Sequence, residues 1–247
     1  MSHTLNISEL FYSIQGEGKK AGSPSFFIRT NYCNLRCQFV SGNLCDTPYT
    51  SWNPEDSKNL GKVTIDYVLS QYRKFYPADV VITGGEPTLQ KGALIELCSS
   101  LKKLDKKIFI TLETNGTKYG EYVNFIDLIS ISPKLATSTP FNEKFRKLHS
   151  SNRINLSILK KYELGSRKKL YDIQWKFVVT SEKDIDEILQ LQKKISFPDK
   201  KVFLMPEGIN RRDLYGKRKL VVNLCKRYNF NYCERLQILI WGNKRGV

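Results

Sequence analysis

Short apolar runs alternate with amphipathic stretches along most of this 247-residue chain. The runs have the length of buried strands, and the stretches have the apolar spacing of surface helices. Strands separated by helices form parallel sheets, because a parallel pair needs a long crossover connection that is usually helical. We therefore expect an α/β fold with a parallel sheet, either open or closed into a barrel. The pattern predicts strands at 26–29, 79–83, 107–112, 127–132, 173–179, 201–205 and 236–240, and helices at 65–76, 91–103, 183–195 and near 210–228.

Ligands bind at the carboxyl ends of the strands in parallel α/β folds. In this sequence those ends carry polar or glycine-rich segments, at residues 83–87, 113–116, 132–134 and 205–208. We expect the functional site to be assembled from them.

Residues 137–171 interrupt the alternation, because they are rich in Ser, Asn, Lys and Arg and show little regular period. We interpret them as a less regular insertion packed on one side of the sheet. A chain of this length with 40% hydrophobic residues can bury one large core. The prediction is a single domain over residues 1–247.

The composition argues against several classes of protein. Only two His are present, which disfavours His-rich metal sites and Ser-His-Asp catalysis. No stretch approaches the ~20 apolar residues of a membrane helix, and residues 1–11 lack the pattern of a signal peptide. We expect a cytoplasmic protein with no membrane partner, in which cysteines stay reduced.

The formal net charge of +16 raises the possibility of a basic nucleic-acid-binding module. Basic runs occur at residues 102–107 and 211–219, on expected helix surfaces and loops. They are scattered, and no nucleic-acid-binding motif accompanies them. We interpret most of this charge as solvated surface and expect no nucleic-acid partner.

Three cysteines, Cys33, Cys37 and Cys45, lie within 13 residues of polar, turn-rich sequence. Three thiolates can hold a metal or an iron–sulfur cluster, and a four-iron cluster bound by three of them keeps one iron open. Open coordination positions are typical of catalytic sites. The other cysteines, at 98, 225 and 233, are interpreted as small buried hydrophobes.

Two glycine-containing segments flank expected strands. Residues 83–87 (TGGEP) follow a strand, where glycines allow close approach of the backbone to a ligand. Residues 16–21 formally match a dinucleotide fingerprint, but a turn and a strand follow where that motif needs a helix, so we reject the match. Arg29 ends the next strand, four residues before Cys33, and is suited to a bidentate grip on a carboxylate.

Together these residues resemble the 7-carboxy-7-deazaguanine synthase family of radical S-adenosylmethionine enzymes. The similarity extends from about residue 7 to residue 247. Its most specific parts are the QGEG start, the CDT-aromatic stretch and the SPK, in this order. The segments that carry it are FYSIQGEGKKAGSPSFFIRTNYCNLRC, CDTPYTSW, ITGGEPTLQ, LETNGT, ISISPK and WGNKRGV.

The resemblance implies a partial (β/α) barrel of the radical S-adenosylmethionine type, usually a homodimer. Cys33, Cys37 and Cys45 would hold a 4Fe–4S cluster whose open iron takes S-adenosylmethionine. An electron from a donor such as flavodoxin would release a 5′-deoxyadenosyl radical, which abstracts hydrogen from C6 of 6-carboxy-5,6,7,8-tetrahydropterin. Ring contraction with loss of ammonia would yield 7-carboxy-7-deazaguanine, in queuosine-type deazapurine biosynthesis.

The resemblance also implies roles for particular residues. The hydroxyl of Thr47 would ligate a Mg²⁺ shared with the substrate, in keeping with the preference of Mg²⁺ for oxygen. The pterin would contact Ile14, Gln15, Gly16, Arg29 and Thr83, with Arg29 as the partner of its carboxylate. The S-adenosylmethionine site would be lined by Asp46, Gly85, Ser132, Pro133, Lys134, Met205, Pro206 and Glu207.

One feature departs from the family. Its usual spacing is Cys-x3-Cys-x2-Cys, whereas seven residues separate Cys37 from Cys45, as if residues 40–44 were inserted. Added loop length costs little closure entropy, so we expect Cys45 still to reach the cluster. The rival enzyme interpretation is a radical S-adenosylmethionine reaction on a different substrate.

Overall fold

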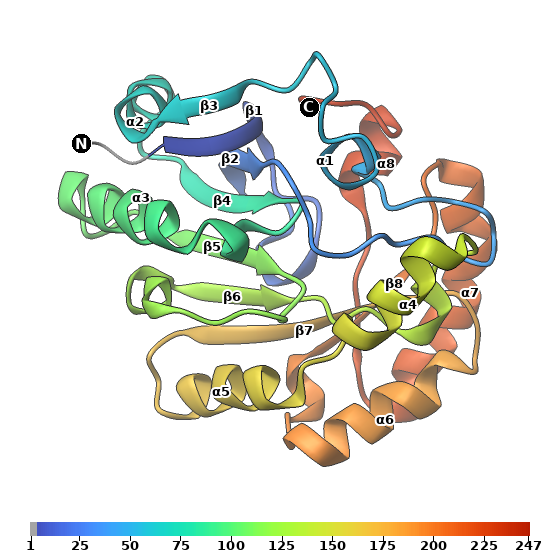
Figure 1. Ribbon diagram of the computed structural model, residues 1–247. Helices are drawn as coiled ribbons and strands as arrows, with labels where there is room; N and C mark the ends of the chain where they lie inside the picture. Colours follow the sequence, from blue (N-terminus) through green and yellow to red (C-terminus); the bar gives the residue numbers. More distant parts are fainter. Residues whose placement is uncertain (1–3) are drawn as a thin grey trace.

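The chain folds around a nine-stranded sheet in a computed structural model that describes residues 4–247 (Figure 1). The strands follow one another across the sheet in the order β3-β1-β2-β4-β5-β6-β7-β8-β9. Their bounds are β1 Thr4–Ile14, β2 Pro24–Thr30, β3 Gly61–Thr64, β4 Asp79–Gly84, β5 Ile110–Thr114, β6 Leu128–Ile131, β7 Asp172–Val179, β8 Val202–Pro206 and β9 Asn231–Tyr232.

The sheet changes character along its width. β1 pairs antiparallel with both β2 and β3, whereas every neighbouring pair from β2 to β9 is parallel. β3 and β9 lie at opposite edges, so the sheet does not close. This architecture confirms the predicted α/β fold with a partial barrel.

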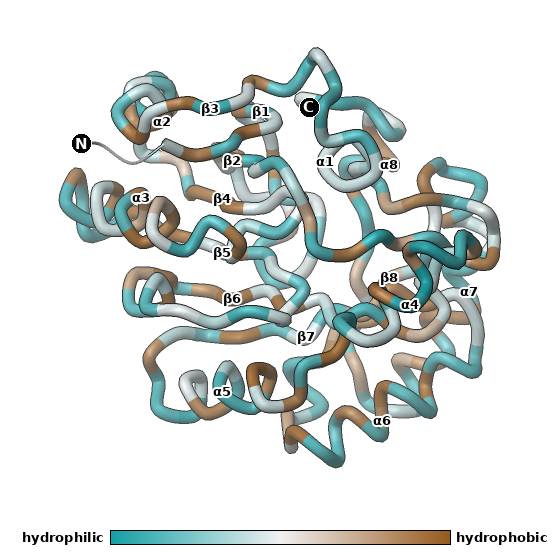
Figure 2. The backbone as a smooth tube through the Cα atoms, in the orientation of Figure 1, coloured by the Kyte–Doolittle hydropathy of each residue, from teal (hydrophilic) through white to brown (hydrophobic). Residues whose placement is uncertain are grey.

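Helices connect the parallel strands and cover the outer face of the sheet. Apolar side chains of α2, α3, α5, α6 and α7 join those of the strands in one buried cluster. In Figure 2 the strands are largely hydrophobic and the outer sides of these helices hydrophilic. The helices are α1 Pro48–Ser51, α2 Ile65–Tyr72, α3 Lys91–Leu104, α4 Glu143–Asn152, α5 Leu156–Arg167, α6 Asp184–Ile195, α7 Arg211–Tyr228 and α8 Leu236–Trp241.

Alternation along the strands separates a core face from a polar inner face. On β7, Ile173, Trp175 and Phe177 belong to the buried cluster beneath the helices. Gln174 and Lys176 lie between them and are buried on the opposite, inner face. Because successive side chains of a strand point to opposite faces, an apparently continuous apolar strand can deliver charged groups to the inside of the barrel.

Two expectations differ from the structure. Residues 236–240 form helix α8 and not a strand, and the outermost position beside β8 is taken by β9. A five-residue apolar run fits both states equally well, which explains the error. Residues 137–171 are also more regular than expected, because they contain α4 and α5. Both helices begin at an Asn whose side chain accepts a backbone N–H, at Asn142 and Asn155.

Within residues 4–247, none of the helices has the length and apolar character needed to cross a membrane.

Candidate active site

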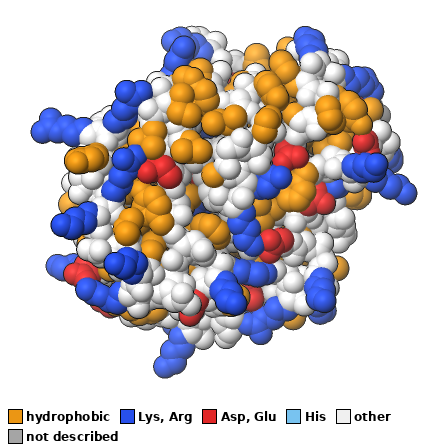
Figure 3. All heavy atoms as spheres, turned by 180° about the vertical axis from the view of Figure 1, so that it is seen from behind, with side chains coloured by type: hydrophobic (Ala, Val, Ile, Leu, Met, Phe, Trp, Pro, Cys, Tyr) orange, Lys and Arg blue, Asp and Glu red, His pale blue; other side chains and the backbone are white. Residues whose placement is uncertain are grey.

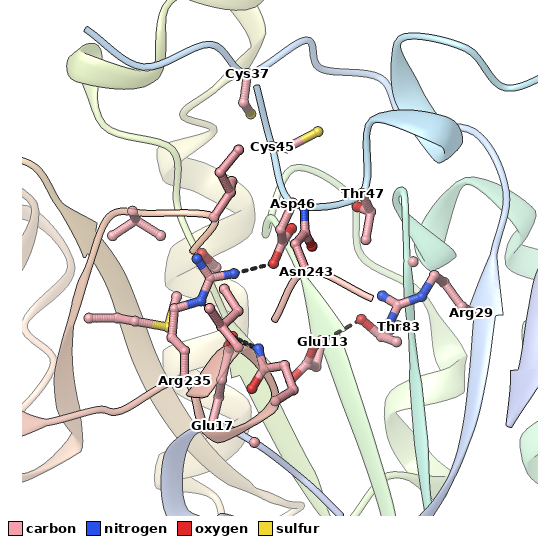
Figure 4. Close-up of a pocket in the computed structure, with 18 of the residues that line it drawn as sticks. Glu17, Arg29, Cys37, Cys45, Asp46, Thr47, Thr83, Glu113, Arg235 and Asn243 are labelled. Atoms are coloured by element: carbon pink, nitrogen blue, oxygen red, sulfur yellow. Dashed lines mark hydrogen bonds and ion pairs between the residues drawn. The ribbon is translucent and has the colours of Figure 1, made fainter. Parts of the chain in front are cut away.

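A cavity opens at the carboxyl ends of the parallel strands, where the sequence placed the site. In Figure 4, Cys37 and Cys45 lie toward one end of it, and Glu17 and Glu113 lie toward the other. Asp46, Thr47 and Asn243 lie between these two ends. The cavity therefore joins a sulfur-lined region to a region of charged and amide side chains.

The structure brings nearly all the predicted site residues to this one cavity. Pro133 and Pro206 are the exceptions: they do not line it, although the residues on either side of each do. The lining includes Ile14, Gln15, Gly16, Arg29, Cys33, Cys37, Cys45, Asp46, Thr47, Thr83, Gly85, Ser132, Lys134, Met205 and Glu207.

The extra residues between Cys37 and Cys45 fold as a small hairpin. Gln38 pairs antiparallel with Leu44, and the Phe39 N–H donates to the Asn43 carbonyl over 2.8 Å. At its base the Cys45 N–H donates to the Cys37 carbonyl over 3.2 Å. The insertion therefore closes on itself and returns Cys45 to the vicinity of Cys37.

The tip of the hairpin is attached to the end of β8 and the start of α7. The Asn43 amide donates to Glu207 Oε1 over 2.8 Å and to Asp213 Oδ2 over 3.1 Å. The Ser41 hydroxyl donates to the same Glu207 oxygen over 3.2 Å. Glu207 is buried at the cavity wall and forms an ion pair with Lys217. The hairpin therefore adds hydrogen bonds to a carboxylate that is already paired with a cation.

All three thiols are free of disulfides. Burial raises the pKa of Cys33 to about 12 and also raises the pKa of Cys37 and Cys45. The three thiols lie close enough for Cys45 to raise the pKa of the other two further, whereas Lys134 lowers all three pKa values. They are thus one buried thiol and two partly buried thiols beside a cation at the wall of one cavity.

This donor set fits an iron–sulfur cluster better than a single ion. Among residues 4–247, no three His, Cys, Asp or Glu side chains converge closely enough to hold one metal ion. Thiolates that hold a cluster bind separate irons and need not meet at a point. Three thiols spread around one cavity meet that requirement.

The TGGEP segment holds the cysteine loop against the sheet. A side chain at Gly84 would meet the Thr30 carbonyl oxygen at 2.2 Å, and one at Gly85 would meet the Tyr32 carbonyl oxygen at 2.1 Å. Gly84 also has a φ of +129°, which favours glycine. The buried Glu86 carboxylate accepts from the Thr114 hydroxyl over 2.7 Å and from the Asn115 N–H over 2.7 Å, which ties β4 to β5. The glycines therefore serve close packing of the loop that carries Cys33.

A network of buried ion pairs forms one side of the cavity. Lys176 on β7 forms an ion pair with Glu17 and lies 3.4 Å from Glu113 on β5. Arg235, just before α8, pairs with Glu17 over 3.2 Å and also with Asp46 (Figure 4). The network connects the QGEG segment, two strands, the chain beyond Cys45 and the start of α8.

The charges in this network stabilise one another. Burial opposes ionisation of Glu17, but Lys176 and Arg235 outweigh it and lower the pKa of Glu17 to about 2. Burial also opposes the charge of Lys176, but Glu113 and Glu17 raise its pKa. Lys176 therefore keeps its proton at neutral pH and acts as a fixed positive charge, not as a base.

Arg29 reaches the cavity from β2, and its guanidinium is held by Glu9. Its Nε donates to Glu9 Oε1 over 2.6 Å, and the Tyr49 hydroxyl donates to the same oxygen over 2.8 Å. Arg245, near the C-terminus, lies 3.5 Å from the other Glu9 oxygen and stacks on the Tyr49 ring at 4.0 Å. The bond to Glu9 uses only Nε, and a guanidinium carries its other four donors on the two terminal nitrogens.

Glu113 completes the polar end. The Thr83 hydroxyl donates to its Oε2 over 2.8 Å, and the Gln15 amide lies 3.4 Å from its Oε1. The sequence placed Glu113 at a strand end but assigned it no role. Lys176 and Arg235 were not predicted, because their partner Glu17 is 159 and 218 residues away in the sequence. The inner-face position of Lys176 on β7 was the available signal.

The profile of the Radical SAM superfamily matches residues 27–206. The match begins within β2, ends with β8 and includes the cysteine loop, and these segments carry much of the cavity lining. The chain therefore belongs to the radical S-adenosylmethionine superfamily.

Comparison with individual relatives identifies the family within this superfamily. The chain is 39% identical over 253 residues to 7-carboxy-7-deazaguanine synthase of Halobacterium salinarum, an alignment that covers 97% of this chain and 91% of that protein. It is 37% identical over 247 residues to the synthase of Rhodopirellula baltica, over 99% of this chain and 89% of the relative. Within the superfamily, the chain belongs to the 7-carboxy-7-deazaguanine synthase family.

A solved structure supports the fold independently. The crystal structure of QueE from Escherichia coli superposes with a TM-score of 0.62 over 93% of both chains, at 24% sequence identity.

Proposed function

We propose that this chain converts 6-carboxy-5,6,7,8-tetrahydropterin to 7-carboxy-7-deazaguanine with loss of ammonia, as a radical S-adenosylmethionine lyase. The observation that carries the proposal is that one cavity has three thiols toward one end and charged side chains of both signs toward the other. The charged end is complementary to a carboxypterin. The family membership supports it. When bound, the cluster and S-adenosylmethionine would supply the radical that starts the reaction.

The polar end complements both ends of the proposed substrate. The aminopyrimidinone edge of a pterin presents adjacent N–H donors, which match the Glu113 carboxylate, and Gln15 offers both a donor and an acceptor. The terminal nitrogens of Arg29 would grip the substrate carboxylate, with the guanidinium fixed by Glu9. Ile14, Gly16 and Thr83 would form the remaining pterin contacts.

The other groups are assigned to the opposite part of the cavity. Cys33, Cys37 and Cys45 would hold a 4Fe–4S cluster. Thr47, beside Asp46, would offer oxygen to a Mg²⁺ shared with the substrate. S-adenosylmethionine would lie among Asp46, Gly85, Ser132, Lys134, Met205 and Glu207.

The network charges would act without exchanging protons. Lys176 and Arg235 remain protonated, and their fixed charges hold Glu17 and Asp46 in place without solvent reorganisation. These ion pairs therefore hold the side chains of the cavity wall in place. The hydrogen abstraction would be carried out by the cofactor.

The direct test is anaerobic incubation of the reconstituted protein with the carboxytetrahydropterin, S-adenosylmethionine and dithionite. We expect a product with the mass and absorption of 7-carboxy-7-deazaguanine and an equal amount of ammonia. Cleavage of S-adenosylmethionine without that product would favour the rival, a radical reaction on another substrate.

The charge distribution on the face seen in Figure 3 gives the nucleic-acid alternative little support. In Figure 3, Lys and Arg are dispersed over the back of the molecule between neutral, hydrophobic and acidic side chains. Tight, salt-resistant binding of tRNA in a filter assay would revive that alternative. A homodimer and an electron donor such as flavodoxin complete the proposal and rest on the family resemblance. We also propose a cytoplasmic location.

A further inference from the structure

Helix α4 lies beside the cysteine loop (Figure 1), and most of its side chains are exposed. Phe141, Lys144, Lys147 and Leu148 form the surface that we name the α4 face. Phe141 and Leu148 are large apolar side chains and are each 51% exposed. Lys144 is three residues from Lys147 and four from Leu148, so the three side chains are neighbours on one side of the helix.

The side of α4 next to these residues packs directly on the cysteine loop. The Phe145 ring meets Trp52 edge-on with centroids 5.4 Å apart, and the Trp52 indole donates to the Cys37 carbonyl over 3.2 Å. Just before α4, the Phe141 N–H donates to Gln38 Oε1 over 3.1 Å. A contact chain of two aromatic side chains, Phe145 and Trp52, thus leads from α4 to the backbone of Cys37.

The charge carried by helix α4 is mainly positive. α4 carries Lys144, Arg146 and Lys147 against a single acid, Glu143, which is 3.7 Å from Arg146. Two exposed apolar side chains on a basic segment are suited to a transient partner with an acidic rim around an apolar centre.

We propose that the α4 face is the docking surface for a small acidic one-electron carrier protein. This inference rests on the proposed function, because an electron is needed only if the three thiols hold a cluster. One electron would pass from the reduced flavin or iron–sulfur centre of the carrier to the cluster. The carrier is oxidised, the cluster is reduced, and no bond forms or breaks.

The test mixes the protein holding an oxidised cluster with a reduced flavodoxin, without substrate, and follows flavodoxin oxidation by its absorbance. The variant is Lys144→Glu/Lys147→Glu. The matched control is Lys160→Glu/Lys161→Glu, which makes the same change of charge at exposed positions on α5, a helix that packs on β7 and α6.

We expect the α4 variant to slow flavodoxin oxidation at low salt by about tenfold or more, because charge complementarity governs the encounter rate. The α5 variant should stay within about twofold of the unsubstituted protein, and added salt should shrink the difference. Replacing Leu148 by Ser in the unsubstituted protein should slow flavodoxin oxidation even at high salt, because this replacement removes an apolar contact and not a charge.

An equal slowing in both charge variants would contradict the proposal, because net charge alone would then attract the carrier. No slowing in either, or a change of oligomeric state caused by the α4 variant, would also contradict it. Dithionite-driven product formation separates this test from the proposed function. It should be the same in all variants if the function is right, and it is missing in all of them if the function is wrong.

Discussion

At the scale of single residues, Arg29 shows how the fold prepares a ligand-binding group before the ligand arrives. Glu9 fixes its orientation, and Tyr49 and Arg245 in turn contact Glu9. The sequence indicated the residue and its task from its place at a strand end. The supporting residues come from the first strand, the cysteine region and the C-terminus, and no local pattern joins these.

Replacing Arg29 by Lys keeps the charge and loses the planar fork. We expect KM for the pterin to rise about 10- to 100-fold, the range for losing a hydrogen bond between charged groups. Cleavage of S-adenosylmethionine without product should fall much less. Steady-state kinetics with both readouts checks this, and an equal fall in both would show that Arg29 serves radical formation instead.

Glu17 predicts a pH dependence of folding. Its pKa is lowered to about 2 from an ordinary value of 4.5, so its contribution to stability is present above pH 4.5 and lost as the pH falls toward 2. Glu17→Gln should remove this part of the acid dependence. At neutral pH it should also cost about 3–5 kcal/mol, the usual effect of breaking a buried pair.

Urea unfolding at a series of pH values, with Glu121→Gln at an exposed site as the control, measures both effects. A variant with the acid profile of the unsubstituted protein would show that Glu17 is not held by its two cations.

At the scale of elements, regular segments were predicted well and their connections less so. The strands 79–83 and 173–179 and the helix 183–195 match β4, β7 and α6 within one residue at each end. The apolar run that became α8 was wrong, because its state depends on β9 occupying the sheet edge. The hairpin at residues 38–44 brings Cys45 back to Cys37, and the expected reach of Cys45 to a cluster stays a prediction. The attachment of the hairpin to Glu207 and Asp213 involves residues more than 160 positions away.

Asn43 is the residue that attaches this hairpin. Asn43→Ala should destabilise the protein by about 1–3 kcal/mol, because the partly buried oxygens of two carboxylates lose their shared donor. Asn43→Asp should cost more, since it places a third carboxylate beside them. Asn152→Ala, an exposed amide on α4, is the control, and equal unfolding free energies for Asn43→Ala and Asn152→Ala would contradict the role of the hairpin tip.

At the scale of the whole molecule, an open sheet of mostly parallel strands gathers the cysteine loop, the ends of most of its strands and the C-terminal segment around one cavity. The sequence predicted that arrangement from the order of its elements and from family motifs. It could not predict the buried network, because Glu17, Lys176 and Arg235 meet only after the barrel has formed. The +16 charge now has distinct parts: a few buried cations in the site, the α4 face, and a dispersed surface.

The central claim is that this cavity is a radical S-adenosylmethionine site despite seven residues between Cys37 and Cys45. Iron and sulfide analysis of the anaerobically reconstituted protein, with an EPR spectrum after reduction, tests it most directly. The account predicts about four irons and four sulfides per chain and an EPR spectrum that changes when S-adenosylmethionine is added. In Cys45→Ala it predicts loss of the bound iron and sulfide and of the EPR spectrum. A protein that binds no iron, or an unchanged spectrum in Cys45→Ala, would contradict it.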